Sequence, residues 1–331
     1  MKAVICLDDP FKTEPTPDEL EAYWRQQLDG IPAITEYSFT RKFSPATLDE
    51  IAADNEIILG GYIADNMYTE EFFTRHPKLR YVESFAHGFG KFDRQAAKNH
   101  NVTFTNTIYG DHTIAEFAMS LLLTICHHVE SESVHYSDLL DSKTSIRSVK
   151  GVVTKQIELY QKTMGIIGLG HIGLCMAQMA RGFGMNVIAY SRHQKEGDAY
   201  SFIEQVSLDE VLRRSDVISI HCSLTDQTKN LLDRENIAKM KEGAILINTA
   251  RGAIVDEEAL KEALDSGHLY AAGLDVVCGE PLSEKTPIFD CDNALITGHI
   301  AWATAESRYR TVRVAIQNLR NWLAGEPTSV I

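Results

Sequence analysis

The chain has 331 residues, of which 44% are hydrophobic and 24% are charged, so it is long enough for two ordinary domains with sizeable cores. Its 46 acidic residues outnumber its 32 basic residues, and the formal net charge of -14 argues against a nucleic-acid partner. No stretch approaches the roughly 20 apolar residues that a membrane helix needs. The N-terminus MKAVICLDDP lacks the pattern of a secretory signal. We therefore expect a cytoplasmic protein that acts on small molecules.

The cysteines are scattered and form no C-x-x-C pair. They are Cys6, Cys126, Cys175, Cys222, Cys278 and Cys291. Zinc fingers and disulfide scaffolds need tighter clusters of cysteine. We expect reduced, mostly buried thiols and no metal site.

Short apolar runs alternate with helical patterns in the first hundred residues, which predicts an α/β domain around a parallel sheet. The predicted strands are KAVIC (2–6), EIILG (56–60), LRYVESF (79–85) and VTFTN (102–106). Helical patterns cover residues 19–28, 69–75 and 93–99.

The apolar stretch TIAEFAMSLLLTICHH (113–128) has the periodicity of a long, heavily buried helix. It is apolar enough to suggest the interface of a homodimer, with ordinary core packing as the alternative. The polar segment ESESVHYSDLLDSKTS that follows is expected to lie on the surface.

From Met164 onward the alternation of strands and helices becomes clearer. The predicted strands are MGIIG (164–168), NVIAY (186–190), DVISIHC (216–222), AILINT (244–249), AAGLDVV (271–277) and ALITG (294–298). The chain then closes with AESRYRTVRVAIQNLRNWLAG, an amphipathic helix with a glycine after its end. The pattern predicts a second doubly wound parallel sheet.

Glycines in G-x-G-x-x-G order, Gly168, Gly170 and Gly173, follow the first strand of this second half and precede a helical pattern. This is the context of a dinucleotide-binding turn. The first glycine would allow the tight turn, the second would let the backbone approach a pyrophosphate, and the third would let helix and strand pack closely. The N–H groups of His171 and Ile172 would then bind the phosphates. A glycine-rich turn used only for packing is the alternative.

The second strand of that half ends in Tyr190-Ser191-Arg192-His193, where NAD-binding domains usually carry Asp or Glu for the ribose hydroxyls. A carboxylate there would repel a 2′-phosphate. Ser191 can instead donate a hydrogen bond to it, and Arg192 can add charge-assisted hydrogen bonds. An ordinary surface arginine is the alternative. Since the acid is missing and the arginine is present, we expect NADP (as NADPH) to be preferred, with NAD as the second choice.

Polar residues follow three later strands, in LINTARGAIVDEEAL, AGLDVVCGEP and LITGHIAWAT. They offer Arg251, Glu280 and His299, a set that suits redox chemistry on a 2-oxo acid. Arginine can bind the substrate carboxylate and polarise the carbonyl, and histidine can protonate the carbonyl oxygen as hydride arrives. A paired carboxylate would orient the imidazole and keep it a proton donor near neutrality. Each residue alone also has an ordinary structural role, and only their combination indicates catalysis.

These motifs, together with SDVISIHCSLTDQT and MKEGAILINTARGAIVDEEAL, resemble the D-isomer-specific 2-hydroxyacid dehydrogenase family. The resemblance covers about residues 77–310. It implies catalytic roles for Arg251, Glu280 and His299, with Asp275 holding the nicotinamide carboxamide and Thr249 lining the same ring. It also implies a Rossmann cofactor domain (111–300) inserted in a flavodoxin-like substrate domain (1–110 and 301–331).

The resemblance further implies a substrate loop in ESFAHGFGKFD, whose backbone N–H groups at His87 and Gly88 would bind the substrate carboxylate. The family commonly has Asp where this chain has Gly90, so the His87 side chain either lines the pocket or only caps a strand. HIAWAT followed by AESR resembles the hydroxypyruvate/glyoxylate reductase (glycerate dehydrogenase) branch. There Trp302 would form a compact lid over a small substrate.

Three other functions stay open at this point. The first is a reductase of bulkier 2-oxo acids. The second is an NAD-linked dehydrogenase of phosphorylated hydroxy acids, which would want an extra basic residue where GGYIADNMY supplies Asp65. The third is a non-enzymatic dinucleotide-sensing corepressor, against which the intact Arg251, Glu280 and His299 argue.

Overall fold

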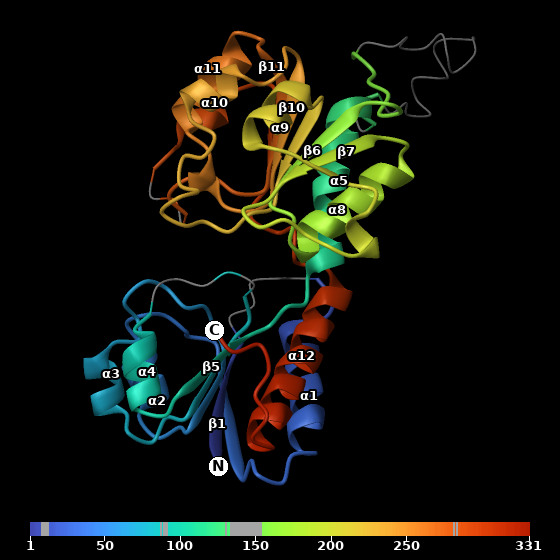
Figure 1. Cartoon of the computed structure of the whole chain (residues 1–331). Coiled ribbons are helices and arrows are strands. Elements are labelled where there is room, and N and C mark those ends of the chain that lie inside the picture. Colours follow the sequence, from blue (N-terminus) through green and yellow to red (C-terminus); the bar gives the residue numbers. More distant parts are fainter. Residues whose placement is uncertain are drawn as a thin grey trace, which may run out of the picture. The chain divides into compact units, whose positions relative to one another are not determined.

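The computed structural model describes residues 1–7, 13–86, 88, 92–129, 131–132, 154–280, 282 and 284–331. The chain forms two units, one made of Met1–Gly110 with Ala303–Ile331 and the other of Asp111–Trp302. The first unit is therefore discontinuous in sequence, and the second is inserted between its two segments (Figure 1). Each unit is built around its own parallel sheet, which confirms the predicted fold class.

The sheet of the discontinuous unit has five parallel strands in the order β2-β1-β3-β4-β5, which is the flavodoxin-like order. The strands are β1 (Lys2–Cys6), β2 (Glu36–Thr40), β3 (Ile57–Gly60), β4 (Tyr81–Ser84) and β5 (Thr103–Asn106). The strand β2 was not predicted because its sequence EYSFT has no buried apolar run, as befits an edge strand.

Helices cover both faces of this sheet. They are α1 (Pro17–Leu28), α2 (Leu48–Ala52), α3 (Glu70–Arg75), α4 (Arg94–Asn99) and α12 (Ala305–Leu323). Side chains alternate along each strand, so Ala3 and Ile5 pack with α1 and α12, whereas Val4 and Cys6 pack with α2, α3 and α4. The closing helix α12 is thus part of the core of this unit.

The sheet of the inserted unit has seven parallel strands in the order β12-β11-β10-β9-β6-β7-β8. They are β6 (Thr163–Ile167), β7 (Asn186–Tyr190), β8 (Glu204–Gln205), β9 (Val217–Ile220), β10 (Ala244–Asn248), β11 (Leu269–Leu274) and β12 (Ala294–Ile296). The order reverses between β6 and β9, which is the topological switch point of a Rossmann fold. Ligands of such sheets bind outside the carboxyl ends of the strands near this point.

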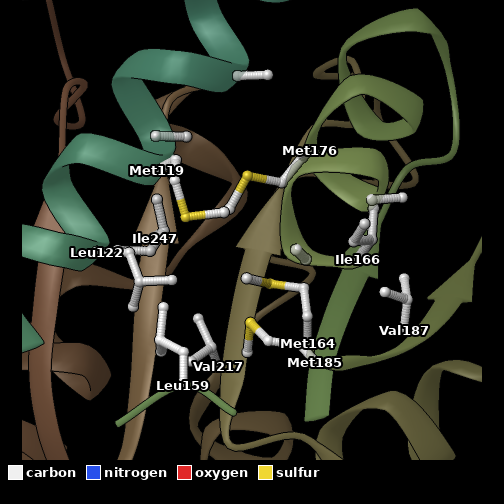
Figure 2. Close-up of a cluster of buried hydrophobic side chains, with 14 of the residues drawn as sticks. Met119, Leu122, Leu159, Met164, Ile166, Met176, Met185, Val187, Val217 and Ile247 are labelled. Carbon is white, nitrogen blue, oxygen red and sulfur yellow. The ribbon is translucent and has the colours of Figure 1, made fainter. Parts of the chain in front are cut away.

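One face of this sheet is covered by α5 (Asp111–His127) and α8 (His171–Gly182), and the other by α9 (Leu208–Arg214), α10 (Arg234–Ala238) and α11 (Glu257–Asp265) (Figure 1). Short 3₁₀ turns occur at Asp198–Tyr200, Gly252–Ile254 and Pro287–Asp290. In Figure 2, Met119 and Leu122 of α5 and Met176 of α8 lie in one cluster with buried side chains of the strands. The apolar stretch 113–128 thus forms the predicted buried helix, apart from its last residue.

Most of the predicted surface segment after His128 lies outside the described residues. All six cysteines are free thiols, and Cys6, Cys126, Cys175 and Cys291 are buried. In the described part of the chain, no helix combines the length and apolarity needed to cross a membrane.

Candidate active site

The glycine turn after β6 has the geometry that a pyrophosphate requires. Gly168 has a φ of 101°, and a Cβ there would lie 2.5 Å from the backbone N of Cys222. A Cβ on Gly173 would lie 2.1 Å from the carbonyl oxygen of Gly168, so only glycine lets the helix pack this closely. Gly170 has open space on its Cβ side and caps α8 without a side-chain hydrogen bond. The helix start therefore fits an incoming phosphate group.

His171 begins α8 with an exposed side chain. Its Nδ1 lies 3.6 Å from Oδ2 of Asp111, at the start of α5. Ile172 is half-buried and packs against the core under the helix. The side chains thus leave the turn open, and the backbone N–H groups are the natural anion donors.

The segment after β7 carries Ser191, which is half-buried, and Arg192, which is exposed. Nε of Arg192 donates a hydrogen bond to Nε2 of His193 at 3.2 Å. Two further hydrogen bonds join Gln205 of β8 to the backbone of Lys195, each 2.7 Å long. A serine and a basic side chain thus lie at the position where NAD-specific folds place an acid, on a segment that is hydrogen-bonded to β8.

The predicted acid–imidazole pair is formed. Nδ1 of His299 lies 2.6 Å from Oε2 of Glu280, and Oε1 of Glu280 accepts a 2.6 Å hydrogen bond from the backbone N of Val277. Burial raises the pKa of Glu280, but the hydrogen bonds from His299 and Val277 outweigh it and leave the pKa below its ordinary value. The carboxylate is thus ionised at neutral pH, and Nε2 is the imidazole nitrogen that can face a substrate.

Arg251 lies close enough to this pair for its charge to act on it. Burial lowers the pKa of the guanidinium, and the charge of Glu280 raises it. The side chain stays cationic, because an arginine in a protein is not deprotonated. Its Nη1 donates a 2.7 Å hydrogen bond to the carbonyl oxygen of Ala250. The cation, the carboxylate and the imidazole predicted from the sequence therefore lie near one another.

The side chain of Asn248, at the end of β10, is 1% exposed and hydrogen-bonds to the backbone of the segment that carries Arg251. Its Nδ2 donates to the carbonyl oxygen of Arg251 at 3.0 Å, and its Oδ1 accepts from the N–H of Ala250 at 3.0 Å. The sequence alone did not single out this residue. A polar residue at the end of a fully buried strand was the available signal.

Asp275, also 1% exposed, fixes the turn that carries His299. Its Oδ1 accepts from the hydroxyl of Thr297 at 2.6 Å and the N–H of Ile300 at 2.9 Å, and its Oδ2 accepts from the N–H of Ala301 at 2.8 Å. His299 has a φ of 58°, a conformation that is unusual for a residue with a side chain. The buried carboxylate holds this turn in place against that cost.

Thr249 follows β10, and its side chain is 8% exposed. Within the described residues, its hydroxyl has no hydrogen-bond partner. A buried hydroxyl without a partner costs free energy unless a ligand supplies one. Its place after β10, two residues before Arg251, suits a group such as a nicotinamide carboxamide.

The substrate residues predicted from the sequence fall in different parts of the chain. Trp302 donates a 3.1 Å hydrogen bond from Nε1 to the carbonyl oxygen of His299, so the indole is held on the turn that carries His299. Gly88 belongs to the discontinuous unit and follows β4, whereas His87 lies outside the described residues.

Comparisons with known proteins agree with this geometry. The family model described as "D-isomer specific 2-hydroxyacid dehydrogenase, NAD binding domain" matches residues 127–301. A hydroxypyruvate reductase of Blautia hydrogenotrophica is 38% identical over 308 residues, which cover 91% of this chain and 94% of that one. A glyoxylate/hydroxypyruvate reductase B of Serratia proteamaculans is 35% identical over 89% of this chain and 93% of that one.

Among solved structures, the apo form of D-lactate dehydrogenase from Escherichia coli is similar with a TM-score of 0.75 and 27% identity, over 100% of both chains. The family and the enzyme class expected from the motifs are thereby confirmed, and a nicotinamide cofactor goes with them. The chain belongs to the D-isomer-specific 2-hydroxyacid dehydrogenase family of enzymes.

Proposed function

We propose that this chain uses NADPH to reduce a small 2-oxo acid, of the glyoxylate or hydroxypyruvate kind, to the D-2-hydroxy acid. The observation that carries the proposal is the 2.6 Å contact between His299 and Glu280, with the Arg251 guanidinium close by. The names of the two relatives above support a substrate of this size.

Three side chains carry out the reduction. Arg251 binds the substrate carboxylate and polarises the carbonyl that is reduced. His299 donates the proton on Nε2 to the carbonyl oxygen, while Glu280 holds Nδ1 and stabilises the imidazolium. The bound cofactor supplies the hydride. In the direction of oxidation, His299 takes the hydroxyl proton back.

The turn of Gly168, Gly170 and Gly173 would hold the pyrophosphate of the cofactor, with the N–H groups of His171 and Ile172 as donors. The open space at Gly170 supports this placement.

At the nicotinamide end, the Thr249 hydroxyl donates to or accepts from the carboxamide. Oδ2 of Asp275 accepts one hydrogen bond in the described structure, from Ala301, and so retains a lone pair for the carboxamide N–H. Ser191 and Arg192 bind the 2′-phosphate at the other end of the cofactor. This makes NADPH the preferred cofactor and NADH the weaker one.

The proposed substrate is a small 2-oxo acid. Trp302 is tied to the carbonyl oxygen of His299 and covers the reacting group on that side. Carboxylate binding by the substrate loop after β4, at His87 and Gly88, stays a prediction from the sequence. We therefore propose that small acids such as glyoxylate and hydroxypyruvate are better substrates than bulkier or phosphorylated 2-oxo acids.

One set of assays tests these proposals. The loss of reduced-cofactor absorbance is followed with glyoxylate, hydroxypyruvate, bulkier 2-oxo acids and a phosphorylated 3-carbon 2-oxo acid, with NADPH and NADH in parallel. The expected result is the highest kcat/KM for a small unphosphorylated acid with NADPH. No turnover with any acid, while NADPH still binds, would instead favour a sensing role.

The chain is also proposed to form a homodimer through α5. Much of the apolar surface of this helix is covered by the core of its own unit, so the proposal depends on the partly exposed Ile114, Phe117 and Leu123. The mass in solution decides it, because a monomer leaves α5 as ordinary core.

A further inference from the structure

Glu257 is the first residue of α11 and is half-buried. Its Oε1 accepts a 2.5 Å hydrogen bond from the backbone N of Cys278. The next residue of the helix, Glu258, is exposed. The Glu257 carboxylate thus binds the segment that follows β11, which also carries Glu280.

The peptide that Glu257 holds is the place where two catalytic segments touch. A Cβ on Gly252 would lie 2.0 Å from the carbonyl carbon of Val277 and 2.4 Å from the backbone N of Cys278. The backbone next to Arg251 therefore rests directly on this peptide. Only glycine permits the approach, and the hydrogen bond from Cys278 to Glu257 holds the peptide against Gly252.

Glu280 depends on the same peptide segment. Its Oε1 accepts the N–H of Val277, while its Oε2 binds His299. A shift of the Val277–Cys278 backbone would therefore move the carboxylate relative to the imidazole, and in-line proton donation loses efficiency with small misplacements.

The charge of Glu257 is costly at this position. Burial raises the pKa of Glu257, the hydrogen bond from the Cys278 N–H lowers it, and the charge of Glu280 raises it again. A second carboxylate so close to Glu280 is destabilised by repulsion between the two charges, and a favourable interaction must offset this. The hydrogen bond to the Cys278 backbone supplies that interaction.

We propose that Glu257 is a positioning residue, which orients Glu280, and through it His299, by holding the backbone N–H of Cys278. This inference rests on the proposed roles of Glu280 and His299. Glu257 itself touches neither the substrate nor the reacting atoms. The property of its side chain that matters is an acceptor oxygen at the right reach, and the negative charge is incidental.

Three substitutions distinguish the effect of the acceptor oxygen of Glu257 from the effect of its negative charge. Glu257→Gln keeps an acceptor oxygen at the same length and loses the charge. Glu257→Asp keeps the charge but withdraws the oxygen by one methylene, and Glu257→Met keeps the length without an acceptor. Glu258→Met, one residue further on the exposed side, is the matched control. Each full-length protein is assayed for kcat and KM with glyoxylate or hydroxypyruvate, for NADPH affinity by fluorescence, and for Tm.

Losing this hydrogen bond predicts about a tenfold fall in kcat for Glu257→Met and a several-fold fall for Glu257→Asp. NADPH affinity should stay within about twofold, because the phosphate turn is untouched. Glu257→Gln is expected to retain kcat within about threefold, and Glu258→Met to match the parent protein. Should Glu257→Met fail to fold, the contrast between Gln and Asp still decides the question.

Two results would overturn the proposal. One is a Glu257→Asp kcat equal to that of Glu258→Met, and the other is a Glu257→Gln kcat as low as that of Glu257→Asp. His299→Ala, assayed in parallel, distinguishes a failure of the positioning role of Glu257 from a failure of the proposed function. If His299→Ala is inactive while the Glu257 variants are normal, only the positioning role fails. If His299→Ala is fully active, the proposed function fails.

Discussion

The side chain of Gln205 makes two hydrogen bonds with the backbone of Lys195. Its Oε1 accepts the Lys195 N–H and its Nε2 donates to the Lys195 carbonyl oxygen, both at 2.7 Å. The two hydrogen bonds link the segment after β7, which carries Ser191 and Arg192, to the neighbouring strand β8. A segment that is held in place before its ligand arrives loses less conformational entropy on binding.

The cofactor preference can be tested where the acid is missing. Ser191→Asp combined with Arg192→Ala places a carboxylate beside the ribose and removes a cation, so kcat/KM should fall for NADPH and rise for NADH. Loss of a charge-assisted hydrogen bond to phosphate predicts at least about a tenfold reversal in the ratio. Arg213→Ala, on the exposed surface of α9, is the control. Equal use of both cofactors by the parent protein would contradict the assignment.

Gln205→Leu should loosen the same segment without touching the reacting groups. We expect KM for NADPH to rise about three- to tenfold, kcat at saturation to stay within about twofold, and KM for NADH to change less. Gln194→Leu, an exposed neighbour of Lys195, controls for a general effect of the substitution. An identical rise in KM for both cofactors would mean that Gln205 serves the fold and not the phosphate.

His299→Ala removes the proposed proton donor. Because general acid catalysis contributes about a hundredfold or more, kcat should fall by at least that factor while NADPH affinity is kept. Glu280→Gln should cause a smaller loss, since the amide oxygen can still accept from Nδ1 of the imidazole but carries no charge to stabilise it. Steady-state kinetics and cofactor fluorescence measure both. An unchanged turnover in His299→Ala would remove this residue from the mechanism.

Asp275→Asn tests how the turn with His299 is held. An amide nitrogen in place of Oδ2 would face the N–H of Ala301, so two donors would meet in a buried site. The free energy of unfolding should fall by about 1–3 kcal/mol, and kcat should fall with it. Denaturant unfolding and kinetics are compared with Asp292→Asn, whose site is exposed. Full stability with full activity would show that the turn does not need this carboxylate.

The sequence was sufficient to predict most strands and the proximity of Arg251, Glu280 and His299, for a physical reason. Parallel strands end at one edge of a sheet, so polar residues after successive strands, such as Arg251 and His299, are brought together by topology alone. The roles of Glu257, Gln205 and Asn248 depend on which backbone group each side chain meets. Glu257 meets Cys278, 21 positions away, and no local pattern encodes that contact.

Glu83 of β4 provides a prediction about pH. It is 0% exposed, accepts a 3.0 Å hydrogen bond from Nδ2 of Asn318 on α12, and also contacts the hydroxyls of Tyr81 and Thr105. Burial raises the pKa of Glu83 from 4.5 to about 7, against the lowering effect of these hydrogen bonds. The folded state therefore holds a proton up to about pH 7 that the unfolded chain releases near pH 4.5.

The free energy of unfolding should consequently fall as pH rises from about 4.5 to 7 and then level off, by up to roughly 3 kcal/mol. Glu83→Gln is neutral at every pH and can keep the hydrogen bonds to Asn318 and Tyr81. It should unfold at a higher temperature than the parent protein at pH 8 and show little difference at pH 5. Glu50→Gln, at an exposed site on α2, should leave the unfolding temperature unchanged at both pH 8 and pH 5. A Tm gain of the same size at both pH values would mean that Glu83 is not the group that binds the proton.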